Sequence, residues 1–230
     1  MRLISFRKLR VVALVACPTL LLLACTSENP NPADVDASSS SQDVQPPLKV
    51  LEAAEKLASG NSGKLKFSKS ENGFSASFPS KKYNYQAEIS PQGEVSTITV
   101  KAPDGSEESG NPQQVIGGQI INRAFRLVHN AMEGGSGDQP MDLQPLRSSI
   151  SMLSGFVSVE DAQLLMQDFD SAQSATLAGD TYGAAEALVS LLQKVLSKIS
   201  GQISDSERSK YKVEIDTLAS EISPLNNTPN

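Results

Sequence analysis

The chain has 230 residues, with 26 acidic and 20 basic side chains and a formal net charge of minus 6. Aromatic residues make up 5% of the chain and tryptophan is absent, so a core must be built mainly from leucine, isoleucine, valine and alanine, which favours helix packing. This composition argues against a fibre, a coiled coil and a disulfide scaffold, and the acidic charge makes nucleic acid an unsuitable partner for the body of the protein.

The first 25 residues have the layout of a secretory signal: a basic stretch, an apolar run and a small residue before a cysteine. The apolar run from Val11 to Ala24 has 14 residues and contains Pro18, whereas a membrane-spanning helix takes roughly 20 residues. We therefore expect residues 1–24 to be a signal peptide rather than a permanent transmembrane helix. Removing those residues, which hold four basic and no acidic side chains, changes the formal net charge from minus 6 to minus 10.

Residues 22–25, Leu-Leu-Ala-Cys, resemble the lipobox of bacterial lipoproteins. The resemblance implies cleavage between Ala24 and Cys25, a diacylglyceryl group on the Cys25 thiol and an acyl group on the new amino terminus. Residues 14–17 match the same pattern, but only six apolar residues precede Cys17 and a proline follows it, so Cys25 is favoured. Lipidation would leave no cysteine for a disulfide, a metal site or a nucleophile. A plain signal peptide with an incidental cysteine is the alternative.

Residues 26–47 contain four prolines and a run of four serines. Such a stretch cannot bury a core, because it has almost no large apolar side chains. We therefore expect residues 25–47 to form a lipidated amino terminus and a disordered tether.

Residues 48–103 are predicted to form a short helix and a four-stranded antiparallel meander. The helix spans residues 48–59 and brings leucine and alanine side chains to one face. Four segments with alternating polar and apolar side chains follow it, separated by turn formers such as Asn72-Gly73. The expected apolar face of the meander comprises Leu65, Phe67, Phe74, Phe78, Tyr83, Tyr85, Ile89, Ile98 and Val100.

The polar segment from residue 102 to 114 predicts a boundary, and residues 112–224 are predicted to form a domain of four or five helices. Capping signals mark the starts of three helices, at Ser158, Asp180 and Ser204. The fold class is therefore α+β, with the meander and the helices forming either one domain or two. The inward side chains expected near the helix ends include Leu48, Val159, Leu177 and Tyr182.

Residues 177–192 resemble the joint of a tetratricopeptide repeat, which would imply protein binding. Only one such unit is visible, and a repeat array needs about three units to bury its core. We therefore expect an ordinary helical hairpin.

No pattern typical of a catalytic or metal site stands out. A catalytic triad would need His129, the single histidine, with Ser136 and Asp138, but no Gly-x-Ser-x-Gly motif surrounds that serine. Asp168 and Asp170 lie two apart on a predicted helix and point in nearly opposite directions, so they cannot share a water. We predict no metal, no cofactor other than the covalent lipid and no enzymatic activity.

Positive charge gathers on the predicted meander of this acidic chain, at Lys64, Lys66, Lys69, Lys81 and Lys82. The favoured interpretation is that these lysines protect an exposed strand edge from pairing with other chains. The alternative is a docking face for an anionic envelope component or an acidic protein patch.

Together these features predict a lipid-anchored protein of the bacterial cell envelope, which acts as a non-enzymatic binding or scaffold subunit with an envelope protein partner. Thr26 occupies the position where an aspartate resembles an inner-membrane retention signal, so we expect the outer membrane, facing the periplasm, if the host has two membranes. The alternatives are an envelope hydrolase with a carboxylate-based site, and a periplasmic inhibitor or immunity protein.

Overall fold

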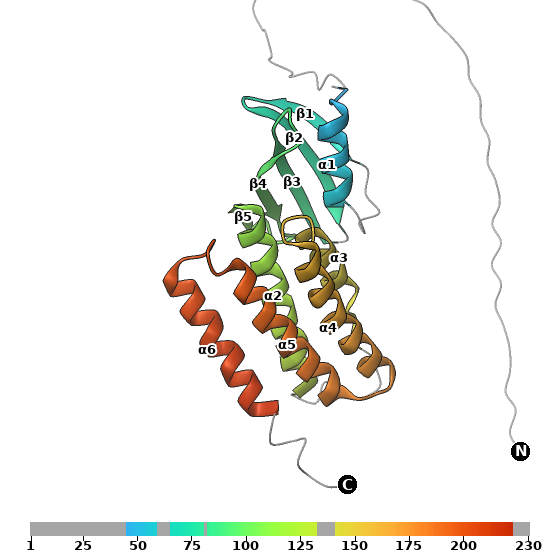
Figure 1. Ribbon diagram of the computed structural model, residues 1–230, viewed down its shortest axis with the longest axis vertical. Helices are drawn as coiled ribbons and strands as arrows, with labels where there is room; N and C mark the ends of the chain where they lie inside the picture. The colour runs from blue at the N-terminus through green and yellow to red at the C-terminus, as the bar shows by residue number, and fades with distance from the viewer. Residues whose placement is uncertain (1–44, 59–64, 81, 133–140, 223–230) are drawn as a thin grey trace, which may run out of the picture. The chain divides into compact units, whose positions relative to one another are not determined.

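A computed structural model describes residues 45–58, 65–80, 82–132 and 141–222 (Figure 1). These residues confirm the α+β fold class, since a short helix and an antiparallel sheet precede a set of helices. The strands are β1 (Lys66–Ser70), β2 (Gly73–Ser80), β3 (Tyr83–Ile89), β4 (Val95–Lys101) and β5 (Glu107–Gly110). The helices are α1 (Leu48–Ala58), α2 (Pro112–Met132), α3 (Gln144–Leu153), α4 (Val159–Leu177), α5 (Thr181–Ile199) and α6 (Asp205–Ile222).

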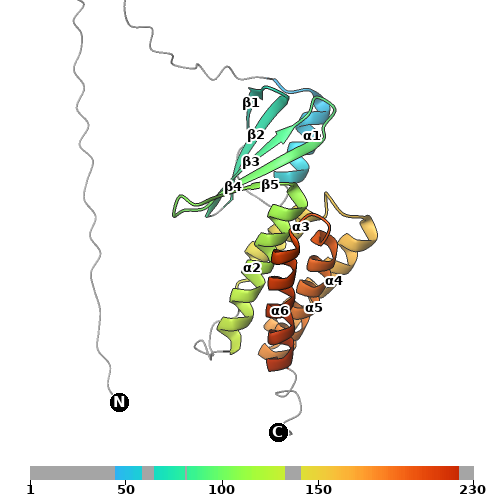
Figure 2. The same cartoon turned by 90° about the vertical axis from the view of Figure 1, so that its left-hand side faces the viewer.

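The sheet is an antiparallel meander in the order β1-β2-β3-β4-β5, with one strand more than the four predicted (Figure 2). The additional strand, β5, lies inside the polar segment that we expected to be a boundary. Asp104 and Gly105 form the tight turn before it, where Gly105 has a φ of 85° and Asp104 accepts a hydrogen bond from the Ser106 amide at 2.9 Å. The prediction missed β5 because its sequence, Glu-Glu-Ser-Gly, has no apolar alternation and is a strand only through its pairing with β4.

One face of the sheet carries the core. Of the nine side chains predicted for this face, Phe78, Tyr85, Ile89, Ile98 and Val100 are buried, and the other four are half-buried. Ala76 and Ala87, paired across β2 and β3, are also fully buried. Helix α1 packs against these two strands, because the small alanines leave room for Val50, Ala54 and Leu57.

Two glycines permit close approaches of the backbone around the sheet. Gly73 begins β2 with a φ of 154°, and a Cβ there would clash with the carbonyl oxygen of Ile89 on β3. Gly93, in the turn between β3 and β4, has a φ of 88°, and a Cβ there would lie 2.8 Å from the carbonyl oxygen of Lys49 on α1. The turn can therefore contact the first turn of α1 only without a side chain.

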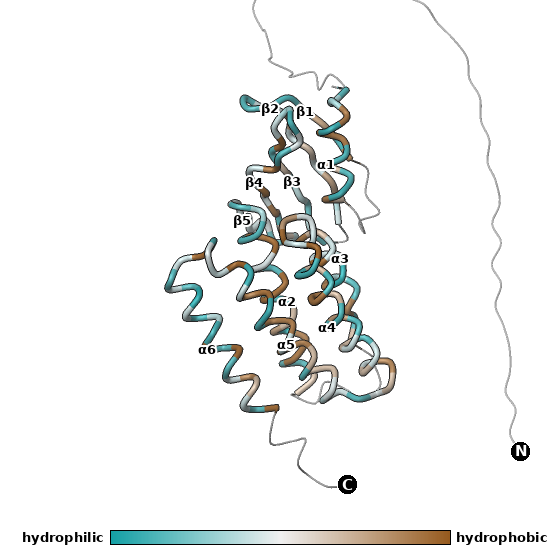
Figure 3. The backbone as a smooth tube through the Cα atoms, in the orientation of Figure 1, coloured by the Kyte–Doolittle hydropathy of each residue, from teal (hydrophilic) through white to brown (hydrophobic). Residues whose placement is uncertain are grey.

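Helix α2 joins the sheet to the remaining helices, because it contacts β4 and β5 as well as α3 and α5. Helices α4 and α5 form a hairpin, and α6 packs on α5. In Figure 3, α6 is hydrophilic over most of its length, consistent with its three buried side chains, Ile215, Leu218 and Ile222. The described residues all belong to one compact unit.

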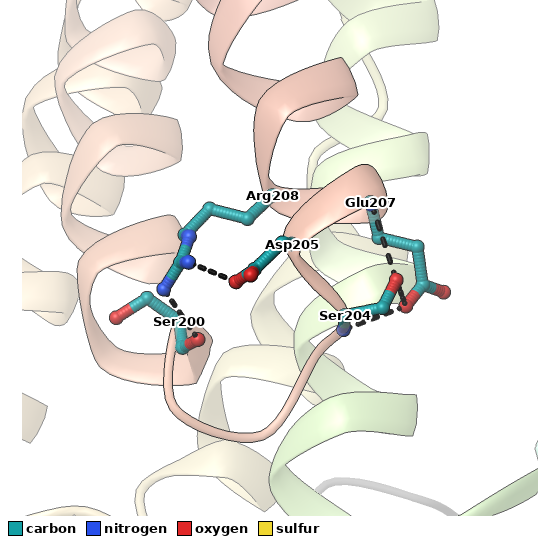
Figure 4. A network of polar contacts seen from close by, with 5 residues as sticks. All are labelled: Ser200, Ser204, Asp205, Glu207 and Arg208. Carbon is teal, nitrogen blue, oxygen red and sulfur yellow. Dashed lines mark hydrogen bonds and ion pairs between the residues drawn. The ribbon is translucent and has the colours of Figure 1, made fainter.

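The three predicted helix caps are present. Ser158 and Asp180 accept hydrogen bonds from the amides of Asp161 and Gly183 at 3.1 and 2.8 Å. Ser204 and Glu207 form a reciprocal capping box, in which the Glu207 amide donates to the Ser204 hydroxyl at 3.2 Å and the Ser204 amide donates to the Glu207 carboxylate at 3.0 Å (Figure 4). Beside this box, Arg208 binds Asp205 and the Ser200 carbonyl, which ties α6 to the end of α5.

Four side chains predicted to point inward are instead exposed: Leu48, Val159, Leu177 and Tyr182, with exposed fractions from 45% to 79%. All four lie in the first or last turn of their helices. Helical periodicity placed them on the apolar stripe, but the neighbouring elements do not extend far enough to cover them. The buried side chains of α4 lie nearer its middle, at Leu165, Phe169 and Ala172.

Candidate functional site

The predicted lipidation site, Cys25, and the cleavage position after Ala24 lie outside the described residues, as does most of the predicted tether. None of the helices in the described ranges combines the length with the hydropathy that a membrane-crossing segment requires.

The predicted docking lysines are only partly described, since Lys64 and Lys81 lie outside the described ranges. The other three, Lys66, Lys69 and Lys82, are exposed. Lys66 pairs with Ser77 on the outer face of the sheet, whereas Lys69 pairs with Phe74 on the opposite face. Because β1 is an edge strand, this placement suits lysines that protect an edge, and these three do not gather on one face.

The residues considered for catalysis do not converge in the described part of the chain. His129 is exposed in the last turn of α2, while Ser136 and Asp138 lie outside the described ranges. Asp168 accepts hydrogen bonds from Ser190 at 3.0 Å and from Lys194 at 2.8 Å, whereas Asp170 is exposed on the other side of α4. Within the same described residues, no three His, Cys, Asp or Glu side chains are placed to hold a metal ion.

A buried arginine forms the centre of a polar network that sequence analysis did not identify. Arg123, on α2, is 9% exposed, and its Nη1 donates to the Pro145 carbonyl at 2.9 Å and to the Ser149 hydroxyl at 2.5 Å. Its Nη2 donates to the Tyr85 hydroxyl at 3.2 Å and to Gln119 Oε1 at 3.1 Å. The guanidinium thus joins the sheet, α2 and α3.

The acceptors around Arg123 also bind one another. The Tyr85 hydroxyl donates to Gln119 Oε1 at 3.0 Å, and the fully buried Ser149 hydroxyl donates to the Pro145 carbonyl at 3.2 Å. Tyr85 is fixed further by a stacked contact with Phe78, with ring centroids 5.3 Å apart. All of these acceptors are neutral groups, so the network holds the positive charge without neutralising it.

A pocket of about 320 Å³ opens beside this network, between β3, the β4–β5 hairpin and α2; we call it the arginine pocket. Arg123 lies 4.6 Å from the ring centroid of Tyr83, and Arg126 lies one turn further along α2. The Arg126 Nε donates to the carbonyl of Asn122 at 3.3 Å. The charged residues that line the pocket are Asp104, Glu107, Glu108, Arg123 and Arg126.

The positive and negative charges near the pocket shift the pKa values of two different groups, Tyr83 and Glu108. Burial alone would raise the pKa of the Tyr83 hydroxyl, but a hydrogen bond with Arg126 and the charges of Arg123 and Arg126 lower it below its usual value. Burial and the negative charge of Glu207 raise the pKa of Glu108. Arginines and carboxylates thus both line the pocket.

A second hollow, of about 530 Å³, lies between α1, the β3–β4 turn and the end of α3. Its lining combines apolar side chains, such as Leu57 and Phe156, with charged ones of both signs, such as Lys56 and Glu94. Among the described residues, the charged side chains of this lining form no hydrogen bond or ion pair, so the hollow is less organised than the arginine pocket.

Only a weak signal in the sequence pointed to the arginine network. Arg123 lies three residues after Ile120 and one before Ala124, within the apolar stripe of α2, where an exposed lysine or arginine is not expected. Gln119 lies four residues away on the same helix, but the other partners of this arginine lie 22 to 38 positions away, so no local pattern reveals the network.

Comparisons with known proteins identified no relative: no protein-family model, no curated protein and no solved structure matches the chain.

Proposed function

We propose that the protein is a lipid-anchored component of the bacterial cell envelope and that its body works by binding rather than by catalysis, as a subunit of an envelope assembly. The observation that carries the proposal is the Leu-Leu-Ala-Cys motif at residues 22–25, which ends a 14-residue apolar run and precedes a polar, proline-rich segment. Thr26 after the cysteine supports the outer membrane as the destination in a host with two membranes.

The body offers a structured surface to a partner. The arginine pocket holds fixed charges of both signs, and such groups provide specificity in binding sites. Two or three acyl chains on Cys25 would provide a lasting anchor, because each buried methylene contributes about 0.8 kcal/mol and one chain alone binds membranes only marginally.

The anchor is tested by replacing Cys25 with serine in the full chain. We expect Cys25→Ser to abolish incorporation of labelled palmitate and either to block processing or to release the protein from membranes. Cys17→Ser is the matched control and should leave both properties unchanged. Palmitate labelling and membrane retention that persist in Cys25→Ser would contradict the proposed anchor.

The binding role is tested by crosslinking in intact cells, followed by identification of the proteins that copurify with the full chain. A discrete assembly containing one or more envelope proteins would support the proposal. Recovery of a monomer that degrades an envelope polymer would contradict it.

The lysine docking hypothesis is tested in the same assay with two sets of substitutions. Lys66 lies near the β2–β3 turn that contains Lys82, whereas Lys69 lies at the other end of β1 and on the other face. If Lys66 and Lys82 contact a partner, Lys66→Gln with Lys82→Gln should reduce partner retention while Lys69→Gln should not. If both variants retain the partner as well as the unaltered chain does, docking is contradicted and protection of the strand edge remains as the role of these lysines.

One observation favours a second candidate, an envelope hydrolase with a carboxylate-based site. Glu108 and Asp104 both line the arginine pocket, and burial raises the pKa of Glu108, whereas hydrogen bonds from Ser106 lower the pKa of Asp104. Carboxyl groups with pKa values shifted in opposite directions are typical of acid and base pairs. Hydrolysis of a purified envelope polymer by the full chain, lost in Glu108→Gln, would favour this function over binding.

A further inference from the structure

We propose that the arginine pocket binds a small zwitterionic ligand, an amino acid or the free carboxyl end of a short peptide, with the ligand carboxylate between Arg126 and Tyr83. The proposal deepens the binding function proposed above and rests on it, but it does not depend on the lipid anchor.

The positive charge of Arg123 is not neutralised by a carboxylate of the described residues. Its guanidinium is almost completely buried, and no carboxylate among the described residues lies within ion-pair distance of it. Four of its five N–H groups bind neutral acceptors, which fixes the orientation of the charge. A buried charge without a counterion is costly, and a bound anion would offset that cost.

Two hydrogen-bond donors, Arg126 and the Tyr83 hydroxyl, line the pocket together with Arg123. Arg126 is exposed, and the hydrogen bond of its Nε to the carbonyl of Asn122 holds the side chain along α2. Arg126 and the Tyr83 hydroxyl both line the pocket, and Arg126 lowers the pKa of that hydroxyl. A planar guanidinium presents paired N–H groups that match the two oxygens of a carboxylate. Arg126 and Tyr83 would therefore contact the ligand, while Arg123 would act through its field from below.

Three carboxyl groups also line the pocket, those of Asp104, Glu107 and Glu108. Three carboxyl groups repel a phosphate dianion more strongly than a monoanionic carboxylate, so they disfavour a phosphate ligand. The same groups would attract the ammonium of an amino acid or peptide. The volume of about 320 Å³ is at the lower end of the range for ligand pockets, which suits a group of one or two residues.

The experiment is a titration of the isotope-labelled full chain, in a nonionic detergent, followed by NMR shifts of backbone amides. The probe is glycylglycine, the smallest peptide that carries both a free ammonium and a free carboxylate. Acetate, methylammonium and inorganic phosphate are titrated separately, each at the same ionic strength. We expect glycylglycine to shift amides of β3, the β4–β5 hairpin and α2, with weaker binding of acetate and weaker binding still of phosphate.

The decisive variant is Arg126→Gln, because Arg126 is exposed and its replacement leaves the core intact. We expect it to weaken glycylglycine binding by about tenfold or more, since charge-assisted hydrogen bonds to a carboxylate are lost. Tyr83→Phe, which keeps the ring under Arg123, should weaken binding by a smaller factor. Arg208→Gln removes a guanidinium at the α5–α6 joint and is the matched control, with binding unchanged.

Three results would overturn the proposal: no shifts in the pocket at saturating glycylglycine, equal affinity in Arg126→Gln and the unaltered chain, or tighter binding of phosphate than of acetate. Crosslinking and palmitate labelling do not use the pocket. A chain that retains its anchor and its crosslinked partner but binds no glycylglycine would therefore refute the ligand while leaving the proposed function intact.

Discussion

Replacing Arg123 with methionine tests whether the buried network stabilises the fold. The change removes four hydrogen bonds that a charged group donates, each worth about 1.5 to 3 kcal/mol by itself. It also removes the cost of burying the charge, which is several kcal/mol. The acceptors keep part of their bonding, because Tyr85 still donates to Gln119 and Ser149 to the Pro145 carbonyl. We therefore expect a net loss of about 2 to 4 kcal/mol.

Thermal unfolding of the full chain in a nonionic detergent, followed by circular dichroism at 222 nm, measures this loss. For a domain of this size, each kcal/mol lowers Tm by about 2 to 4 °C, so Arg123→Met should lower Tm by roughly 4 to 16 °C. Arg208→Met, at an exposed position, is the control and should change stability by less than about 1 kcal/mol. Equal effects of the two substitutions, or a higher Tm for Arg123→Met, would refute the reasoning.

A double-mutant cycle separates the network from the general cost of a core substitution. Ser149→Ala should cost about 1 kcal/mol in the unaltered chain and much less when Arg123 is already methionine. Additive losses would show that the contact between the two side chains contributes nothing to stability.

Three further predictions concern a partly buried carboxyl group, an ion pair between α4 and α5, and the contact of α2 with α5. Burial raises the pKa of Glu108, so the folded state binds the Glu108 proton more tightly than the unfolded chain does. The stability that this group contributes is present at low pH and is lost as the pH rises through the raised pKa. Glu108→Gln should therefore raise Tm more at pH 7.5 than at pH 4.5. Asp168→Asn should cost about 1 kcal/mol by weakening the ion pair with Lys194, which is partly buried, whereas Asp170→Asn should change stability by less than about 0.5 kcal/mol. Gly117→Ala should cost about 1 to 2 kcal/mol, since its Cβ would lie 2.5 Å from the side chain of the α5 residue Ile199; an unchanged Tm would contradict the packing of α2 on α5.

The order of the secondary-structure elements could be predicted because the signals for them are local. Each confirmed cap joins a side chain to an amide three residues away, as in the Ser204–Glu207 capping box. Strand alternation and turn residues are equally local, and they placed β2, β3 and β4. The sequence also predicts that Lys66 and Lys69 lie on opposite faces of the sheet, because residues three apart on a strand point to opposite sides.

The candidate site could not be predicted in the same way. In the sequence, Arg123 is a single charged residue within the apolar stripe of a helix. Its burial depends on hydrogen bonds to Tyr85 from β3 and Ser149 from α3, which the sequence does not place beside it. The predicted burial of side chains at the helix ends was wrong for the same reason. Val159 and Leu177 fit the helical periodicity, but no described element packs over them, and both are exposed. Periodicity predicts which face of a helix points inward, but only tertiary packing decides which residues along that face are buried.

The sequence by itself determined the α+β class, the caps, most strand positions and the motif that predicts an anchor at Cys25, because each depends on residues close together in the chain. Tertiary structure alone decided the fifth strand, which exists through its pairing with β4, and the arginine pocket. The physical reason is that a polar side chain is stable in the interior only when distant segments supply its hydrogen-bond partners. Those segments meet only when the sheet, α2 and α3 have packed together.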